Sequence, residues 1–434
     1  MTSTTAEIDF FDPKTNDCPY PAYEQLRSQA PVWQDPITGM WTLSRYDDIR
    51  AALLDSERFT NRIGNSAGAT EKGVRPEDPE KARQLLEAAA IEKEIQKLYE
   101  EKGWPTCPTL SGREEPEHMQ LRRLFDYAFR PARIRELDPF VEQLANRLFD
   151  AFIDDGRCEF VAQLAIPLPL YVIGRQMGVP DEDMPQIKAW TDAWIQRMGL
   201  MQTPEQRVWS AEQEIEAQHY FQKRYEGLRT QPNDSLLSDL VNNQVKEWGR
   251  TLTDNELHSE MMADLFVGGS ETTTNALSGG VMLLISNPDV WEKVKGDTDT
   301  YLEPFLEEVL RIESPVQCLL RETSVDVEMH GVTIPSGAIV SLRFASANRD
   351  EQRYENPEDF DLDRKQSRSH LAFGLGTHHC LGAPLARREL YYGFKVLFER
   401  IDEMWFIDGE NDFHYHPNYF LRALKHLNIG FKQA

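Results

Sequence analysis

One cysteine of this chain, Cys380, ends a glycine-rich turn and precedes a helical pattern, in the segment FGLGTHHCLG at residues 373–382. Glycines two positions apart permit a tight turn whose amide hydrogens converge on one spot. Apolar residues at helical spacing predict a helix from Leu381 onward, with Cys380 at its N-terminus. The positive end of a helix dipole lowers the pKa of a thiol. We therefore expect Cys380 to be a thiolate, acting as a nucleophile or as a metal ligand.

This segment alone leaves other interpretations of Cys380 open. A free cysteine is often a small buried hydrophobe. His378, His379 and Cys380 could also contribute to a zinc site, which requires further ligands at short spacing. The other cysteines are scattered with no C-x-x-C pair, at Cys18, Cys107, Cys158 and Cys318. The spacing therefore argues against zinc.

Four more motifs accompany the cysteine segment, which fits F-G-x-G-x-H-x-C-x-G at every fixed position. In chain order they are residues 118–122 (HMQLR), 268–273 (GGSETT), 308–311 (EVLR) and 356–364 (NPEDFDLDR). Together they resemble the haem-crossing, oxygen-activation, E-x-x-R, meander and haem-ligand motifs of the cytochrome P450 family. The resemblance covers essentially the whole chain and is closest to bacterial, soluble haem-thiolate monooxygenases.

The resemblance implies a mainly α fold with a small β-rich region, formed by a single cytochrome P450 domain over residues 1–434. We expect a helical core at 117–313 and β-rich parts near 31–60, 320–345 and 404–434. The residues themselves predict a hairpin around Asp35-Pro36-Ile37-Thr38-Gly39 and one long central helix capped by Thr253. An insert at 62–117 contains a helical pattern at 78–102. This helix is either a lid over the substrate entrance or a surface helix that only packs.

The resemblance also implies haem b as the cofactor, with Cys380 as the axial ligand of the iron. Phe373 is expected to pack near the sulfur, although it could be plain core. His118, Arg122, Arg321 and His378 match the positions that hold the haem propionates, which favour cationic partners. The complete expected cofactor-binding set is His118, Arg122, Gly269, Arg321, Phe373, His378, Cys380 and Gly382.

Two residues are expected to deliver protons to bound oxygen, because that step requires an acid and a hydroxyl. Glu271 and Thr272 supply both, while the preceding glycines weaken the helix. Alternatively, Thr272 only donates back to a backbone carbonyl. The pair argues against a peroxide-driven peroxygenase. Glu308, Arg311 and Arg364 are expected to form a structural network that holds the cysteine loop.

The substrate is expected to be a hydrophobic small molecule that undergoes hydroxylation or oxidative demethylation. Its pocket is expected to include Phe266, Val316, Gln317, Cys318 and Leu319. Two covering helices would add aromatic and sulfur-containing side chains, namely Trp190, Trp194, Met198 and Met201. Two other classes remain open: a haem protein that only binds haem or senses a gas, and a thiol enzyme without haem.

The formal charge of −25, from 47 basic and 72 acidic residues, argues against a nucleic-acid partner. A local excess of arginine is nevertheless expected to bind an acidic ferredoxin-type electron donor, itself reduced by NAD(P)H through a reductase. The candidates are Arg122, Arg123, Arg130, Arg133, Arg387 and Arg388. We expect a cytoplasmic monomer with no membrane span, because the N-terminal stretch is polar and no apolar run is long enough.

Overall fold

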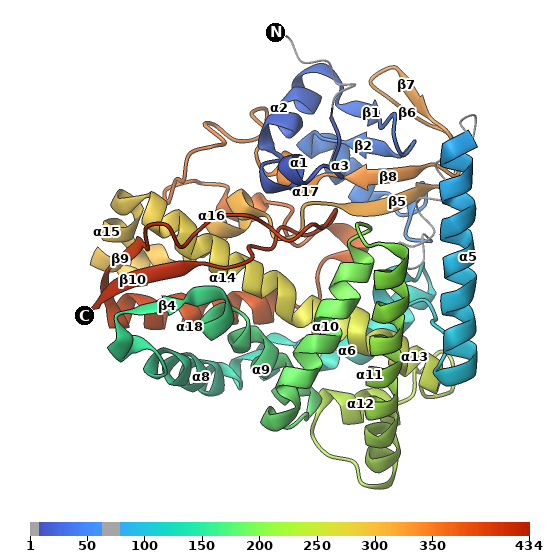
Figure 1. The fold of residues 1–434 in the computed structure, drawn as a ribbon, viewed down its shortest axis with the longest axis horizontal. Coiled ribbons are helices and arrows are strands. Elements are labelled where there is room, and N and C mark those ends of the chain that lie inside the picture. Colours follow the sequence, from blue (N-terminus) through green and yellow to red (C-terminus); the bar gives the residue numbers. More distant parts are fainter. Residues whose placement is uncertain (1–7, 63–78) are drawn as a thin grey trace.

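The computed structural model describes residues 8–62 and 79–434, with side chains omitted for 79–89. This described part is mainly helical and carries small sheets, as predicted (Figure 1). Its α-helices are α1 (Pro13–Asp17), α2 (Tyr20–Gln29), α3 (Tyr46–Leu54), α5 (Pro79–Lys102), α6 (Glu117–Phe129), α7 (Pro131–Arg135), α8 (Asp138–Asp150), α9 (Pro167–Met177), α10 (Met184–Met198), α11 (Pro204–Thr230), α12 (Leu236–Asn242), α13 (Asp254–Glu260), α14 (Gly268–Ser286), α15 (Pro288–Gly296), α16 (Thr298–Glu313), α17 (Phe344–Ala347) and α18 (Ala383–Arg400). None of the described helices is both long and apolar enough to cross a bilayer.

The strands form a five-stranded sheet of order β1-β2-β8-β5-β3, a three-stranded sheet of order β4-β10-β9, and a β6-β7 pair. They are β1 (Val32–Gln34), β2 (Trp41–Leu43), β3 (Phe59–Thr60), β4 (Arg157–Glu159), β5 (Leu319–Thr323), β6 (Val327–Met329), β7 (Val332–Ile334), β8 (Ile339–Leu342), β9 (Ile401–Phe406) and β10 (Asn428–Gln433). The predicted hairpin is present as β1 and β2, and Asp35 Oδ1 accepts the amide of Ile37 at 2.7 Å in its turn. Strand β4 lies inside the stretch that we expected to be helical. Three residues are too few to show a strand period.

The central helix begins as predicted, with Thr253 as its cap. Thr253 and Glu256 form a capping box, in which the Glu256 amide donates to Thr253 Oγ1 at 3.3 Å and the Thr253 amide donates to Glu256 Oε2 at 2.8 Å. The sequence did not indicate that residues 261–267, between α13 and α14, are π-helical. The helical path is continuous through this segment, so one long element carries α13 and α14 across the molecule.

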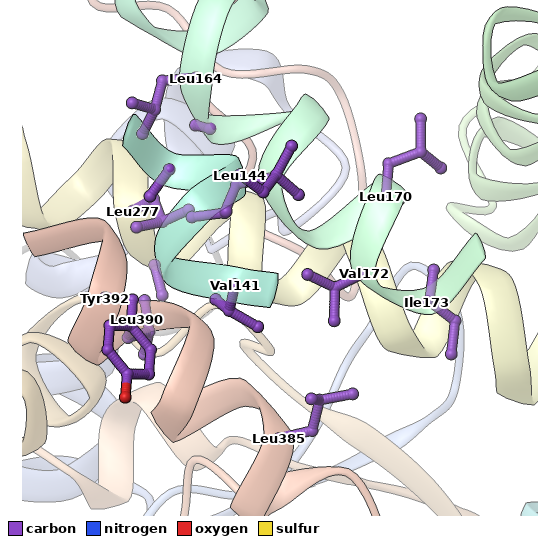
Figure 2. Packing of buried hydrophobic residues seen from close by; sticks show 14 of the residues in the cluster. Val141, Leu144, Leu164, Leu170, Val172, Ile173, Leu277, Leu385, Leu390 and Tyr392 are labelled. Carbon is purple, nitrogen blue, oxygen red and sulfur yellow. The ribbon is translucent and has the colours of Figure 1, made fainter. Parts of the chain in front are cut away.

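The core beside the site is formed by α8, α9, α14 and α18 (Figure 2). Leu277 of α14 and Leu390 of α18 are fully buried, and each such leucine contributes about 1.5–3 kcal/mol of transfer free energy. Helices α14 and α18 approach closely at glycines. A Cβ on Gly280 would lie 2.4 Å from the ring of Phe394. This contact fixes α18, and with it the cysteine loop that precedes α18.

The helix predicted at 78–102 is present as α5, beside α11 at the edge of the molecule (Figure 1). Ile95 and Tyr99 of α5 pack against Ala211 and Ile215 of α11. The helical pattern predicted at 78–102 also includes Leu85, Leu86 and Ala89, whose side chains lie outside the described part of the structure. The described part of the insert is therefore bound to the helix that follows α10.

Candidate active site

A cavity of about 500 Å³ lies between the cysteine loop, α14, α10, α6 and β5. It gathers many of the expected site residues from distant parts of the chain. Those that line it are His118, Arg122, Gly269, Thr272, Val316, Leu319, Arg321, Phe373, His378, Cys380 and Gly382.

The turn before Cys380 depends on its two glycines. Gly374 and Gly376 have φ angles of +66° and +75°, which only glycine adopts cheaply. A Cβ on Gly376 would also lie 2.7 Å from the backbone oxygen of Leu53. The Cys380 amide donates to the carbonyl of Phe373 at 2.9 Å and closes the loop. The glycine-rich turn is present as the sequence indicated.

The environment of Cys380 differs from the prediction in two respects. The helix α18 begins at Ala383 rather than Leu381, and Pro384 lies in its first turn, where the missing N–H costs nothing. Burial raises the pKa of the Cys380 thiol, although the amides of Gly382 and Ala383 act to lower it. In this balance, desolvation of the sulfur outweighs the helix terminus. A bound metal cation would reverse this balance and favour the thiolate.

Basic side chains gather at one wall of the cavity, and two of them, His378 and Arg321, form no ion pair with a described residue. His378 Nδ1 is buried with no hydrogen-bond partner, and burial together with the neighbouring His118 and Arg321 lowers the His378 pKa to about 3. Burial also lowers the pKa of Arg321 to about 10, although the charge of Glu114 opposes that shift. Arg321 Nη1 donates to the carbonyl of Leu320 at 2.7 Å, and no carboxylate of the described residues forms an ion pair with Arg321. A ligand that carries carboxylates fits this wall, as haem does with its two propionates.

Arg122 belongs to the same wall and also contacts the cysteine loop. Its Nη1 donates to the carbonyls of Thr377 at 3.2 Å and His379 at 2.9 Å. The rings of His118 and His378 lie with their centroids 4.1 Å apart. The structure therefore brings together all four side chains that the resemblance assigned to the propionates.

Glu271 and Thr272 point in different directions. Thr272 lines the cavity, and its Oγ1 donates to the carbonyl of Gly268 at 3.2 Å, the back-bond weighed above. Glu271 does not line the cavity, and its Oε2 lies 4.0 Å from Lys188 Nζ on α10. Burial raises the pKa of Glu271, and Lys188 opposes that shift. The hydroxyl of the expected relay faces the cavity, whereas the acid faces the covering helix.

Three of the five expected pocket residues lie away from the lining. Phe266 is fully buried, 5.5 Å from the ring of Phe221 between centroids. Gln317 accepts the Tyr23 hydroxyl at 3.0 Å, and the Cys318 thiol lies against the Tyr419 carbonyl. These three side chains pack against residues outside the cavity, whereas Val316 and Leu319 line it. Of the covering side chains, Trp194 and Met198 line the cavity, and Trp190 and Met201 do not.

Three charged residues of the lining were missed: Asp264, Glu389 and Arg197. The Asp264 carboxylate accepts the amide and the hydroxyl of Ser111, both at 2.8 Å, and burial raises its pKa. Both carboxylate oxygens of Glu389 are buried without a hydrogen-bond partner, and burial raises its pKa well above the usual range. The sequence offered one indication of Glu389, because it is a charged residue within an apolar helical pattern.

The expected network of Glu308, Arg311 and Arg364 is assembled behind the site. Glu308 accepts Arg311 at 2.8 and 2.9 Å and Arg364 at 3.1 and 3.2 Å. Arg311 also donates to the carbonyls of Asn348 and Asp359, at 3.0 and 2.9 Å. These contacts hold the segment at 348–364 rather than the cysteine loop itself.

Contact with the cysteine loop comes instead from the preceding residue, Glu307, which the sequence did not single out. Its carboxylate accepts His370 at 3.0 Å and Arg387 at 2.7 Å, and the Arg387 guanidinium lies 4.5 Å from the ring centroid of Phe373. Burial alone would raise the Glu307 pKa, but the bonds from His370 and Arg387 outweigh it and lower the pKa to about 2. Glu307 thus ties α16 to both ends of the loop.

Most arginines of the expected docking patch already have acidic partners. Arg388 pairs with Asp138 at 2.6 Å, Arg133 with Asp239 at 3.4 Å, and Arg123 with Glu247. Arg130 differs, because its guanidinium stacks over Tyr127 at 4.1 Å and forms no ion pair with a described residue. The net positive potential of this face is therefore smaller than the arginine count indicates.

The chain is similar over nearly its whole length to known proteins. The family model for Cytochrome P450 matches residues 199–402. A steroid C26-monooxygenase of Mycobacterium tuberculosis (strain ATCC 25618 / H37Rv) is 30% identical over 94% of this chain and 93% of its own length. Cytochrome P450 monooxygenase PikC of Streptomyces venezuelae is 31% identical over 96% and 92%.

Solved structures show the same likeness. CYP109Q5 from Chondromyces apiculatus superposes with a TM-score of 0.80 at 29% identity, covering 99% of this chain and 100% of that one. CYP109E1 from Bacillus megaterium, solved with testosterone, gives a TM-score of 0.79 at 29% identity, covering 96% and 99%. The likeness in sequence and in structure extends along nearly the whole chain. This chain therefore belongs to the cytochrome P450 family of haem-thiolate monooxygenases.

Proposed function

We propose that the enzyme inserts one atom of O2 into a hydrophobic small molecule, by hydroxylation or oxidative demethylation. One observation carries this proposal: a 500 Å³ cavity has Cys380 in its lining together with a cationic wall and many apolar side chains. Apolar cavities of this size favour ligands with little charge. Relatives named for steroid oxidation and a solved relative holding testosterone support the same substrate class.

We assign the haem-binding roles to residues that line this cavity. Cys380 would ligate the iron, while His118, Arg122, Arg321 and His378 would hold the propionates. Phe373, Gly269 and Gly382 would lie against the macrocycle. Bound haem supplies the iron at which O2 is activated. The orphaned Nδ1 of His378 and the unpaired Arg321 fit this role, because propionate oxygens would satisfy both.

Thr272 and Glu271 would manage the protons. The Thr272 hydroxyl faces the cavity and can donate there once it leaves the Gly268 carbonyl. Glu271 can pass a proton to this hydroxyl only after its side chain turns from Lys188. A carboxyl with a raised pKa is suited to this exchange, because it holds a proton closer to neutral pH.

Electrons would come from NAD(P)H through a reductase and a ferredoxin that binds near the cysteine loop. Arg122, Arg123, Arg130, Arg133, Arg387 and Arg388 remain its candidate contacts. Arg130 is the candidate whose charge no described carboxylate neutralises.

The carbon monoxide spectrum of the reduced protein tests the proposal. A thiolate ligand moves the Soret band to the long wavelength typical of this family. We expect Cys380→Ser to abolish that band and Cys18→Ser, at an exposed cysteine outside the cavity, to keep it. A long-wavelength band that persists in Cys380→Ser would overturn the assignment of the ligand.

A further inference from the structure

One cation of the cavity lining is unexplained by the haem site. Arg197 lies on α10, one turn beyond Trp194, and lines the cavity beside Met198. Its side chain is only 13% exposed. The other basic residues of the lining form the wall assigned to the propionates, namely His118, Arg122, Arg321 and His378. The position of this guanidinium needs a separate explanation, because removing a charge from water costs free energy unless the charge has partners.

Two partners outside the lining hold Arg197 from behind. Its Nη1 donates to Glu214 Oε2 of α11 at 2.8 Å and to the hydroxyl of Tyr99 of α5. Tyr99 in turn donates to Glu214 Oε2 at 2.6 Å. Both of these hydrogen bonds use Nη1, so Nε and Nη2 donate to no residue in the described part of the chain. Because Arg197 also lines the cavity, we take these N–H groups to be the donors open to a ligand there.

Charge balance decides which group those donors prefer. Arg197 forms an ion pair with Glu214. The negative charge of nearby Glu92 also raises the Arg197 pKa, and Glu92 forms an ion pair with Arg207. Two cations and two carboxylates sum to zero. Burial and Glu214 raise the pKa of Tyr99 well above its usual range, so its hydroxyl stays neutral. A substrate carboxylate would add an uncompensated negative charge to this partly dry site, whereas a neutral oxygen would add none.

We propose that Arg197 binds a neutral carbonyl-type oxygen of the substrate, such as that of a ketone, ester or amide. The oxygen accepts from the free edge of the guanidinium while the hydrophobic body fills the apolar part of the cavity. Helix α5 thereby acquires a role: Tyr99 is a positioning residue that holds the fork in place. This inference rests on the proposed monooxygenase function and narrows its substrate class.

Three probe ligands of one chain length test the preference in the haem-loaded enzyme: 2-dodecanone, dodecane and dodecanoate. Each is titrated against the ferric protein, and its Kd is taken from the change in the Soret band on binding. We expect 2-dodecanone to bind about 10- to 100-fold more tightly than dodecane, the gain typical of a hydrogen bond to a charged donor. Dodecanoate should gain less than the ketone. Equal binding of ketone and alkane, or tightest binding of dodecanoate, would overturn the proposal.

Arg197→Met separates this interaction from general packing. The variant should bring the dodecane to 2-dodecanone Kd ratio close to 1. Arg229→Met is the matched control, because Arg229 lies on α11, pairs with Asp254 and does not line the cavity. It should keep the wild-type ratio. An unchanged ratio in Arg197→Met contradicts the role of Arg197.

Glu214→Gln provides an independent test, because it should reverse the preference between 2-dodecanone and dodecanoate. It leaves the Arg197 charge unmatched, so dodecanoate should then bind more tightly than 2-dodecanone. Tyr99→Phe should reduce the ketone preference severalfold while the melting temperature changes little. If neither change occurs, the charge argument is wrong. A normal long-wavelength CO band in all variants shows that the haem-thiolate assignment stands whatever the ligand results.

Discussion

Adjacent residues of α14 illustrate how much depends on which way a single side chain points. Thr272 faces the cavity and Glu271 faces Lys188, although the sequence presents them as one acid and alcohol pair. Consecutive helical positions are separated by about 100°, and here that rotation turns Thr272 toward the cavity and Glu271 toward α10. A relay through both residues therefore requires motion of the acid.

Removal of the Thr272 hydroxyl should uncouple the reaction. In Thr272→Ala we expect NADH consumption to continue while product per NADH falls severalfold, because the proton donor that faces the cavity is lost. Product and NADH are measured together, with a reductase and ferredoxin added. Thr272→Ser should restore coupling. Thr274→Ala, at a hydroxyl that donates to the Ala165 carbonyl outside the cavity, should leave it unchanged; loss of coupling there instead would point to helix damage.

The loop glycine Gly376 should tolerate no side chain. Gly376→Ala adds left-handed strain and places a Cβ 2.7 Å from the Leu53 oxygen, so we expect a loss of several kcal/mol and poor haem retention. Gly331→Ala is the matched control, because Gly331 has a φ of +72° but open space around its Cβ position. The control should cost only about 1 kcal/mol. Urea unfolding and the ratio of Soret to protein absorbance measure both effects, and equal losses would exclude the close contact as the cause.

At the scale of elements, consecutive glutamates of α16 hold different parts of the site. Glu308 holds the segment at 348–364, and Glu307 holds the cysteine loop through His370 and Arg387. A helix places neighbours on different faces, so one helix can support two loops. The motif predicted the first contact, whereas the second depends on residues 63 and 80 positions away that no local pattern connects.

The Glu307 contact should give stability that depends on pH. Its pKa falls from 4.5 to about 2 on folding, so its contribution is fully present above about pH 4.5 and is lost as the pH falls toward 2. We expect Glu307→Gln to lower the free energy of unfolding by about 3 kcal/mol at pH 7. The difference from wild type should shrink below pH 4.5. Urea unfolding at several pH values measures it, and a difference that does not change down to pH 3 would contradict the ion pair as its source.

Several features of the elements follow from local chemistry, and others do not. The Thr253 cap, the β1-β2 hairpin and α5 were predictable because each depends on residues close in sequence. The start of α18 was misplaced by two residues, although Pro384 was available as a signal. The π-helical turn at 261–267 and strand β4 carry no distinctive pattern. Both depend on packing against distant partners.

Across the whole molecule, a formal charge of −25 coexists with an arginine-rich face that we propose binds an acidic ferredoxin. Ion pairs within the fold neutralise most of the arginines there, so the sequence count overstated the patch. The lining of the cavity was predicted where a motif fixed it, as for His118 and Cys380. It was missed where only tertiary packing decides, as for Arg197 and Asp264.

Electron delivery should therefore depend on Arg130 and on salt. We expect Arg130→Glu to slow the first reduction by a ferredoxin about tenfold at low ionic strength, because it reverses an unpaired charge near the donor. The effect should diminish as salt screens the charges over about 10 Å. Stopped-flow reduction of the CO-saturated enzyme measures the rate. Arg229→Glu on α11 should have little effect, and equal slowing by both variants would argue against a local docking site.

The pairing of β10 with β4 has a consequence for how the protein is made. The Leu427 amide donates to the Glu159 carboxylate across 268 positions. Strand β4 is therefore synthesised long before β10, with which it pairs. At ribosomal rates of about 5–20 residues per second, β4 waits for tens of seconds with an unpaired edge. The side chains that we assign to haem binding likewise come together only after most of the chain has been translated. Haem capture is therefore a late event in biosynthesis, and chaperones have a long interval in which to act on the nascent chain.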